Sequence, residues 1–130
     1  MQFCDPFILV CDDEAPIRTS ISMVLGLMGY RVETALDGGE ALQKIHANPD
    51  RFALLLTDHK MQPVDGLTLV RELRASGFRG KILVLSGCLE NKDREAYLEL
   101  SVDEIMFKPF NTSEFRDVVT QLITDEQPAG

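Results

Sequence analysis

Short runs of apolar and β-branched residues recur along the chain at a regular interval, and longer segments with helical periodicity separate them. The runs are Phe7 to Cys11, Arg31 to Ala35, Phe52 to Thr57, Lys81 to Leu85 and Glu104 to Phe107. In the segments between them, apolar residues return every three or four positions, as on the buried face of a helix. The pattern predicts five strand-helix repeats.

Apolar strands that alternate with helices form parallel sheets, because right-handed crossovers place helices on both faces. Only the run Arg31 to Ala35 alternates polar and apolar residues, which indicates an edge strand. We therefore predict an α/β fold: a doubly wound five-stranded parallel sheet of order 2-1-3-4-5, flavodoxin-like in its (βα)5 topology. Asp37 and Asn111 each precede a glutamate by three residues, which predicts that they cap helices.

The chain has 130 residues, the size of one domain, which we assign to residues 1–124, with 125–130 as a flexible C-terminal tail. Its net charge of −8 opposes binding to nucleic acid and to anionic lipid surfaces. Residues 1 to 30 lack the pattern of a signal peptide, and no apolar run approaches the ~20 residues of a membrane span. The three cysteines have no CxxC spacing. We expect a cytoplasmic protein without direct nucleic-acid or membrane contacts.

Polar residues stand just past the carboxyl ends of four predicted strands. They are Asp12, Asp13 and Glu14 after the first strand, Asp58 after the third, Ser86 after the fourth and Lys108 after the fifth. In an open parallel sheet, ligands bind at this edge, where the strand order reverses. Neighbouring carboxylates repel unless a cation lies between them, and oxygen ligands with open positions suit Mg²⁺. With a hydroxyl and an ammonium group opposite, the set predicts transfer of a phosphoryl group to Asp58.

These residues, with Gly66 and the run from Lys108 to Phe110, resemble the motifs of receiver domains of two-component response regulators. The resemblance extends over residues 5 to 124 and implies that Asp58 accepts a phosphoryl group from a phosphohistidine. It implies a regulatory phosphoacceptor domain that assists its own phosphotransfer and dephosphorylation, not an enzyme with a separate substrate. It also implies a cis bond between Lys108 and Pro109.

The resemblance assigns roles to the residues around the acceptor. It implies that Mg²⁺ is bound by Asp13, Asp58 and the backbone carbonyl of Lys60, with Asp12 acting through water. It also implies that Ser86 and Lys108 contact the phosphoryl oxygens. Ser86 and the residue at position 105 are the implied switch pair. A sensor histidine kinase or a histidine phosphotransfer protein is the implied phosphoryl donor. A downstream effector, an output domain or a second copy of the chain would bind the face made by the fourth helix, fifth strand and fifth helix.

The sequence departs from the family pattern at two places near the acceptor. Gln62 replaces the usual proline, with Pro63 following it, and Ile105 replaces the aromatic switch residue. Ile105 has a stiff χ1 and no hydroxyl, so the usual aromatic movement cannot operate. The helix predicted at about residues 89–100 has only a thin apolar face, so we expect activation to move that helix while Ile105 stays packed. Lys60 places a long cation where it can reach attacking water.

Three other functions compete with this interpretation. A haloacid-dehalogenase-type phosphatase would use Asp12 as its nucleophile, but Glu14 stands where its second aspartate is expected. A flavodoxin-type electron carrier needs a phosphate loop after the first strand, and the acidic residues there would repel a flavin phosphate. A phosphorylation-independent interaction module would not require the full set of site residues. We interpret His46 and His59 as isolated loop or surface histidines.

Overall fold

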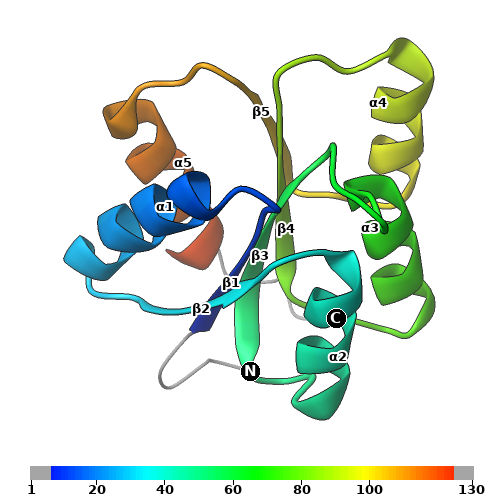
Figure 1. The fold of residues 1–130 in the computed structure, drawn as a ribbon, viewed down its shortest axis with the longest axis horizontal. Helices are drawn as coiled ribbons and strands as arrows, with labels where there is room; N and C mark the ends of the chain where they lie inside the picture. Colours follow the sequence, from blue (N-terminus) through cyan, green and yellow to red (C-terminus); the bar gives the residue numbers. More distant parts are fainter. Residues whose placement is uncertain (1–6, 125–130) are drawn as a thin grey trace.

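The structure, a computed structural model, describes residues 7–124. Within them, five parallel strands form one sheet in the order β2-β1-β3-β4-β5, with helices on both faces (Figure 1). The elements are β1 Phe7–Cys11, α1 Ala15–Leu27, β2 Arg31–Ala35, α2 Gly38–Ala47, β3 Phe52–Asp58, α3 Gly66–Ala75, β4 Lys81–Ser86, α4 Asn91–Glu99, β5 Glu104–Phe107 and α5 Thr112–Thr124. The predicted fold class and strand order are confirmed. The tail predicted at 125–130 lies outside the described residues.

The central strands are buried on both faces because they divide their side chains between two cores. Leu9 and Leu55 belong to a cluster beneath α2, α3 and α4, whereas Ile8 and Leu54 belong to a second cluster beneath α1 and α5. Figure 1 shows the same division, with α1 and α5 on one side of the sheet and the other three helices opposite. This two-sided burial explains why the strands are nearly continuous apolar runs in the sequence.

Two helices begin where the sequence predicts caps. The side chain of Asp37 accepts a hydrogen bond from the backbone N–H of Glu40 at 2.9 Å, and that of Asn111 accepts one from the N–H of Glu114 at 2.6 Å. Each bond satisfies a backbone donor that the first turn of a helix leaves free. None of the helices within residues 7–124 has the length and apolar composition that crossing a lipid bilayer requires.

The third and fourth strands are each one residue longer than predicted. Asp58 is paired in register with Leu85, and Ser86 with Phe107, so both polar residues end a strand instead of following it. Their backbones are fixed by the sheet ladder. The sheet therefore holds the acceptor candidate and its neighbour more rigidly than the predicted loops would.

A single arginine joins the loops at the opposite end of the sheet. The Arg74 guanidinium, on α3, donates hydrogen bonds to the carbonyls of Phe78 and Gly80, which precede β4, and to those of Leu100 and Ser101, which follow α4. It also lies 3.7 Å from the carboxylate of Asp103. The side chain thus ties the amino-terminal ends of β4 and β5 to α3.

Candidate functional site

Three carboxylates meet at the carboxyl edge of the sheet. Asp12 follows β1, Asp13 follows it, and Asp58 ends β3. One oxygen of each lies within 4.8 Å of the others. Asp12 and Asp58 are buried, with exposed fractions of 1% and 7%, whereas Asp13 faces solvent. β1 and β3 are adjacent parallel strands, so their ends deliver these side chains to one place.

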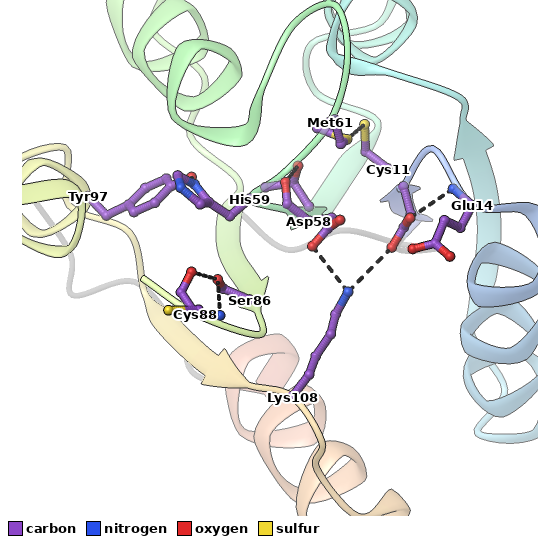
Figure 2. A network of polar contacts seen from close by, with 11 residues as sticks. Cys11, Glu14, Asp58, His59, Met61, Ser86, Cys88, Tyr97 and Lys108 are labelled. Carbon is purple, nitrogen blue, oxygen red and sulfur yellow. Dashed lines mark hydrogen bonds and ion pairs between the residues drawn. The ribbon is translucent and has the colours of Figure 1, made fainter. Parts of the chain in front are cut away.

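Lys108 supplies the positive charge of this cluster. Its ammonium nitrogen lies 3.1 Å from Oδ1 of Asp58 and 3.9 Å from Oδ2 of Asp12 (Figure 2). The lysine follows β5, on the far side of β4 from Asp58, and its side chain reaches back across the edge. Its backbone N–H is fixed by the carbonyl of Ser86 at 2.8 Å. The peptide bond between Lys108 and Pro109 is cis, as predicted.

The surroundings of Asp12 disfavour its ionised form. Burial raises its pKa, and the charges of Asp58 and Asp13 raise it further, against the backbone N–H of Glu14 and the Lys108 ammonium, which lower it. Oδ1 accepts the Glu14 N–H at 2.9 Å, but the buried Oδ2 has no hydrogen-bond partner. A buried carboxylate oxygen without a partner is costly. This oxygen, in an oxygen-only donor set that includes an exposed carboxylate, fits a hard divalent cation such as Mg²⁺.

The hydroxyl of Ser86 makes its hydrogen bonds inside its own loop. It donates to the carbonyl of Cys88 at 2.8 Å and accepts from the N–H of the same residue at 3.2 Å (Figure 2). Among residues 7–124, no hydrogen bond joins this hydroxyl to Asp58 or Lys108. The structure therefore places Ser86 at the predicted edge of the sheet, with its hydroxyl engaged elsewhere.

The remaining predicted positions lie around this edge. Lys60 is exposed in the loop that follows β3, and that loop contains a second cis peptide bond, between Gln62 and Pro63. Ile105 lies on β5, half-buried against the cluster beneath α2, α3 and α4. Glu14 is exposed and precedes the first residue of α1. Among residues 7–124, the structure places no contact between Lys60 and the carboxylates.

A polar network that the sequence pattern does not predict lies beside Asp58. Nδ1 of His59 lies 2.6 Å from the hydroxyl of Tyr97 (Figure 2). Nε2 lies 3.5 Å from the carboxylate of Asp93. The interpretation of His59 as an isolated histidine is therefore wrong. Its partners lie more than thirty positions away on α4, and no fixed spacing in the sequence marks such a contact. The one available signal is a tyrosine on the thin apolar face of that helix.

The two cysteines near the site differ in exposure. Cys11 is buried and its thiol lies 3.5 Å from the sulfur of Met61. Burial raises its pKa to about 12, so the thiol is not a reactive thiolate at neutral pH. Cys88 is exposed and enters the site only through its backbone, which holds Ser86. Cys11 therefore acts as a packing residue, and Cys88 acts through its backbone next to the site.

Known proteins share this sequence pattern and this fold. The family model described as "Response regulator receiver domain" matches residues 8–120. Response regulator MprA of Mycobacterium avium is 37% identical over 121 residues, which make up 93% of this chain and 52% of that protein. The chain thus spans about half the length of the curated relatives it matches.

Solved structures agree with the sequence relatives. A response regulator receiver protein from Pseudomonas putida has a TM-score of 0.83 at 29% identity, over 91% of this chain and 98% of that one. Response regulator protein TrrA of Thermotoga maritima, solved in complex with Mg²⁺ and BeF, has a TM-score of 0.78 at 32% identity, over 90% of this chain and 98% of that one. Sequence, fold and acidic site agree: the chain belongs to the family of response regulator receiver domains of two-component systems.

Proposed function

We propose that Asp58 accepts a phosphoryl group from a phosphohistidine of a sensor histidine kinase or a histidine phosphotransfer protein. A carboxylate oxygen attacks phosphorus, the bond between phosphorus and the imidazole nitrogen breaks, and the imidazole takes up a proton from solvent. The observation that carries this proposal is the 3.1 Å contact between the Asp58 carboxylate and the Lys108 ammonium inside the acidic cluster.

Asp13, Asp58 and the backbone carbonyl of Lys60 would hold Mg²⁺, with Asp12 acting through water. When bound, Mg²⁺ neutralises negative charge on the transferred phosphoryl group. The unpartnered, buried Oδ2 of Asp12 supports this assignment, as does the Mg²⁺ in the structure of the related TrrA.

Lys108 and Ser86 are the proposed donors to the phosphoryl oxygens. The Lys108 ammonium already contacts Asp58 and needs no large movement to follow the new group. The Ser86 hydroxyl must first leave its hydrogen bonds with Cys88, which makes this turn part of the switch together with Ile105. In dephosphorylation, water attacks phosphorus, the bond to the Asp58 oxygen breaks and inorganic phosphate leaves. The exposed Lys60 would orient that water.

The proposed surface for an effector or an output domain is the face of α4, β5 and α5. Leu98 on α4 is 58% exposed and Phe107 on β5 is 46% exposed, and large apolar side chains in solvent are typical of contact surfaces. A second copy of the chain could occupy the same face.

We propose the cytoplasm as the compartment, because a phosphohistidine donor of this kind is presented there.

Intact-mass measurement after incubation with acetyl phosphate and Mg²⁺ tests the acceptor. The wild type should gain one phosphoryl group, and hydroxylamine should remove it, as expected for an acyl phosphate. Asp58→Asn should gain none. Asp50→Asn removes an equal charge from an exposed residue after α2 and should be labelled like the wild type.

Three results would refute the assignment. Labelling of Asp58→Asn on another residue would mean that a different carboxylate is the acceptor. No labelling of the wild type by acetyl phosphate or by a phosphohistidine protein would favour a phosphorylation-independent interaction module. Hydrolysis of acetyl phosphate over many turnovers, lost in Asp12→Asn and kept in Asp58→Asn, would favour the phosphatase alternative.

A further inference from the structure

Helix α4 contributes a single buried side chain to the core. Among its nine residues, Asn91–Glu99, only Tyr97 is buried, and its exposed fraction is 0%. Its ring lies in the core beneath α2, α3 and α4, where Ile105 also packs. A helix held by so few apolar contacts can change position at a low energetic cost. The surroundings of Tyr97 therefore determine where α4 lies.

The Tyr97 hydroxyl contacts His59, the residue that follows Asp58. Figure 2 shows the phenol and the imidazole of His59 facing each other next to Asp58. The two rings meet edge to face at 5.4 Å between centroids, and the hydroxyl lies 2.6 Å from Nδ1. A Cβ placed on Gly66 would lie 2.9 Å from this hydroxyl and 2.5 Å from the backbone oxygen of Asp58. The hydroxyl thus touches both ends of the loop that joins β3 to α3.

The groups around His59 favour one tautomer of its ring. The carboxylate of Asp93 can only accept, so Nε2 of His59 carries the proton that faces it. In the neutral ring, Nδ1 is then an acceptor for the Tyr97 O–H. Burial raises the pKa of Tyr97, with the charges of Asp65, Asp93 and Asp58 adding to the effect, so the phenol keeps its proton. The two side chains that face the imidazole, Tyr97 and Asp93, both lie on α4.

We propose that Tyr97 is a positioning residue that couples the state of Asp58 to α4 through the hydrogen bond with His59. The inference rests on the proposed phosphorylation of Asp58. His59 is the next residue in the chain, and its N–H is bonded to the carbonyl of Leu85 at 3.0 Å. A phosphoryl group on Asp58 adds charge and volume beside this peptide, and the imidazole transmits the resulting shift to the helix. Tyr97 thereby supplies the aromatic hydroxyl that Ile105 lacks.

Hydrogen exchange with mass spectrometry tests this coupling in the whole chain. Exchange is compared with and without Mg²⁺ and beryllofluoride in the wild type, in Tyr97→Phe and in Tyr30→Phe. Tyr97→Phe keeps the ring and removes only the hydroxyl. Tyr30→Phe makes the same chemical change on the opposite face of the sheet, where Tyr30 packs half-buried. Acetyl phosphate labelling of each protein, followed by intact mass, measures the chemistry separately.

The wild type and Tyr30→Phe should change protection at residues 89–100 on addition of the phosphoryl mimic. Tyr97→Phe should be labelled normally by acetyl phosphate but lose that change. His59→Asn, whose amide oxygen stands near the position of Nδ1, should retain it. The chain has no Trp and two Tyr, so the fluorescence of Tyr30→Phe comes from Tyr97 alone and should respond to the mimic.

Each contrary result has a distinct meaning. If Tyr97→Phe is labelled and its α4 segment responds like the wild type, the coupling is refuted while the phosphoacceptor stands. If the wild type is not labelled at all, the proposed function fails and the inference falls with it. If Tyr97→Phe melts like Tyr30→Phe but is not labelled, the hydroxyl serves the chemistry and not the coupling, which also overturns the inference. If Tyr97→Phe does not fold, His59→Leu is used in its place. This variant should be labelled by acetyl phosphate without a change in protection at residues 89–100. A preserved change there would refute the coupling.

Discussion

Replacing Asp12 by asparagine should stabilise the protein when Mg²⁺ is absent. The substitution keeps the size of the side chain and the Oδ1 acceptor for the Glu14 N–H. It removes a buried negative charge from the acidic cluster and replaces Oδ2, which has no hydrogen-bond partner, by an amide N–H group. Asparagine also removes the attraction to Lys108, so the size of the effect depends on which charge lies closer.

The distances allow the balance to be worked out. One oxygen each of Asp13 and Asp58 lies within 4.8 Å of an Asp12 oxygen. At an effective dielectric constant of ~20, a negative charge at 4.8 Å repels the Asp12 charge by about 3.5 kcal/mol. The Lys108 ammonium at 3.9 Å attracts it by about 4 kcal/mol. The attraction to Lys108 and the repulsion from the buried Asp58 nearly cancel. What remains is the solvent-screened repulsion from Asp13 and the cost of the unpartnered oxygen, together about 1 to 2 kcal/mol. For a domain of this size that corresponds to a rise in melting temperature of about 4 to 8 °C.

Thermal unfolding followed by circular dichroism, in chelator and then with increasing Mg²⁺, measures this effect. Asp12→Asn should melt above the wild type in chelator. The wild type should gain more from Mg²⁺, so the difference in melting temperature should shrink or change sign as Mg²⁺ is added. Sodium chloride at matched ionic strength controls for screening. Asp50→Asn, which changes the net charge equally, should melt like the wild type. An Asp12→Asn protein that melts below the wild type in chelator would show that the Lys108 contact outweighs the crowding, contrary to the calculation.

Three further substitutions test other parts of the structure by thermal or chemical denaturation. Gly66→Ala should cost about 1 to 3 kcal/mol and slow acetyl phosphate labelling because its methyl group meets backbone, whereas Gly26→Ala, with open space around it, should not destabilise; equal melting of both would contradict the close approach. Phe115→Ala should cost about 3 to 5 kcal/mol, since it leaves a cavity under α5, and a loss below 1 kcal/mol would mean that the core refills. Arg74→Met should lower the free energy of unfolding by about 2 to 4 kcal/mol, because four carbonyls lose their donor. The exposed Arg71→Met should leave it unchanged. Similar losses in both variants would mean that the lost charge causes the effect.

Sequence reasoning locates Asp58 and Lys108 at one edge because parallel strands must deliver their carboxyl ends together. Only the strand order is needed for this, and the alternating run Arg31 to Ala35 indicates the edge strand from which the predicted order begins. The caps at Asp37 and Asn111 are local, which is why a spacing of three residues suffices to predict them. Strand ends are less certain, because pairing of Asp58 with Leu85 depends on how far the neighbouring strand continues.

Side-chain direction is the part that the sequence does not contain. Ser86 can turn its hydroxyl to the site or to its own loop, and the choice depends on the backbone of Cys88, two residues away. The contact between His59 and Tyr97 joins residues that share no periodic pattern, so only the packing of α4 against the end of β3 creates it. Such contacts arise from tertiary structure and follow no local rule.

The hydrogen bonds of Arg74 give α4 one fixed end and one adjustable end. The guanidinium holds the carbonyls of Leu100 and Ser101, directly after the helix, whereas the amino-terminal residue Asn91 is exposed. A displacement of α4 is therefore a pivot about its carboxyl terminus, and its amplitude grows with distance from that hinge. A given rotation moves the first turn of the helix farthest. A partner that binds near Asn91 would discriminate between two orientations of α4 better than one that binds near Leu100.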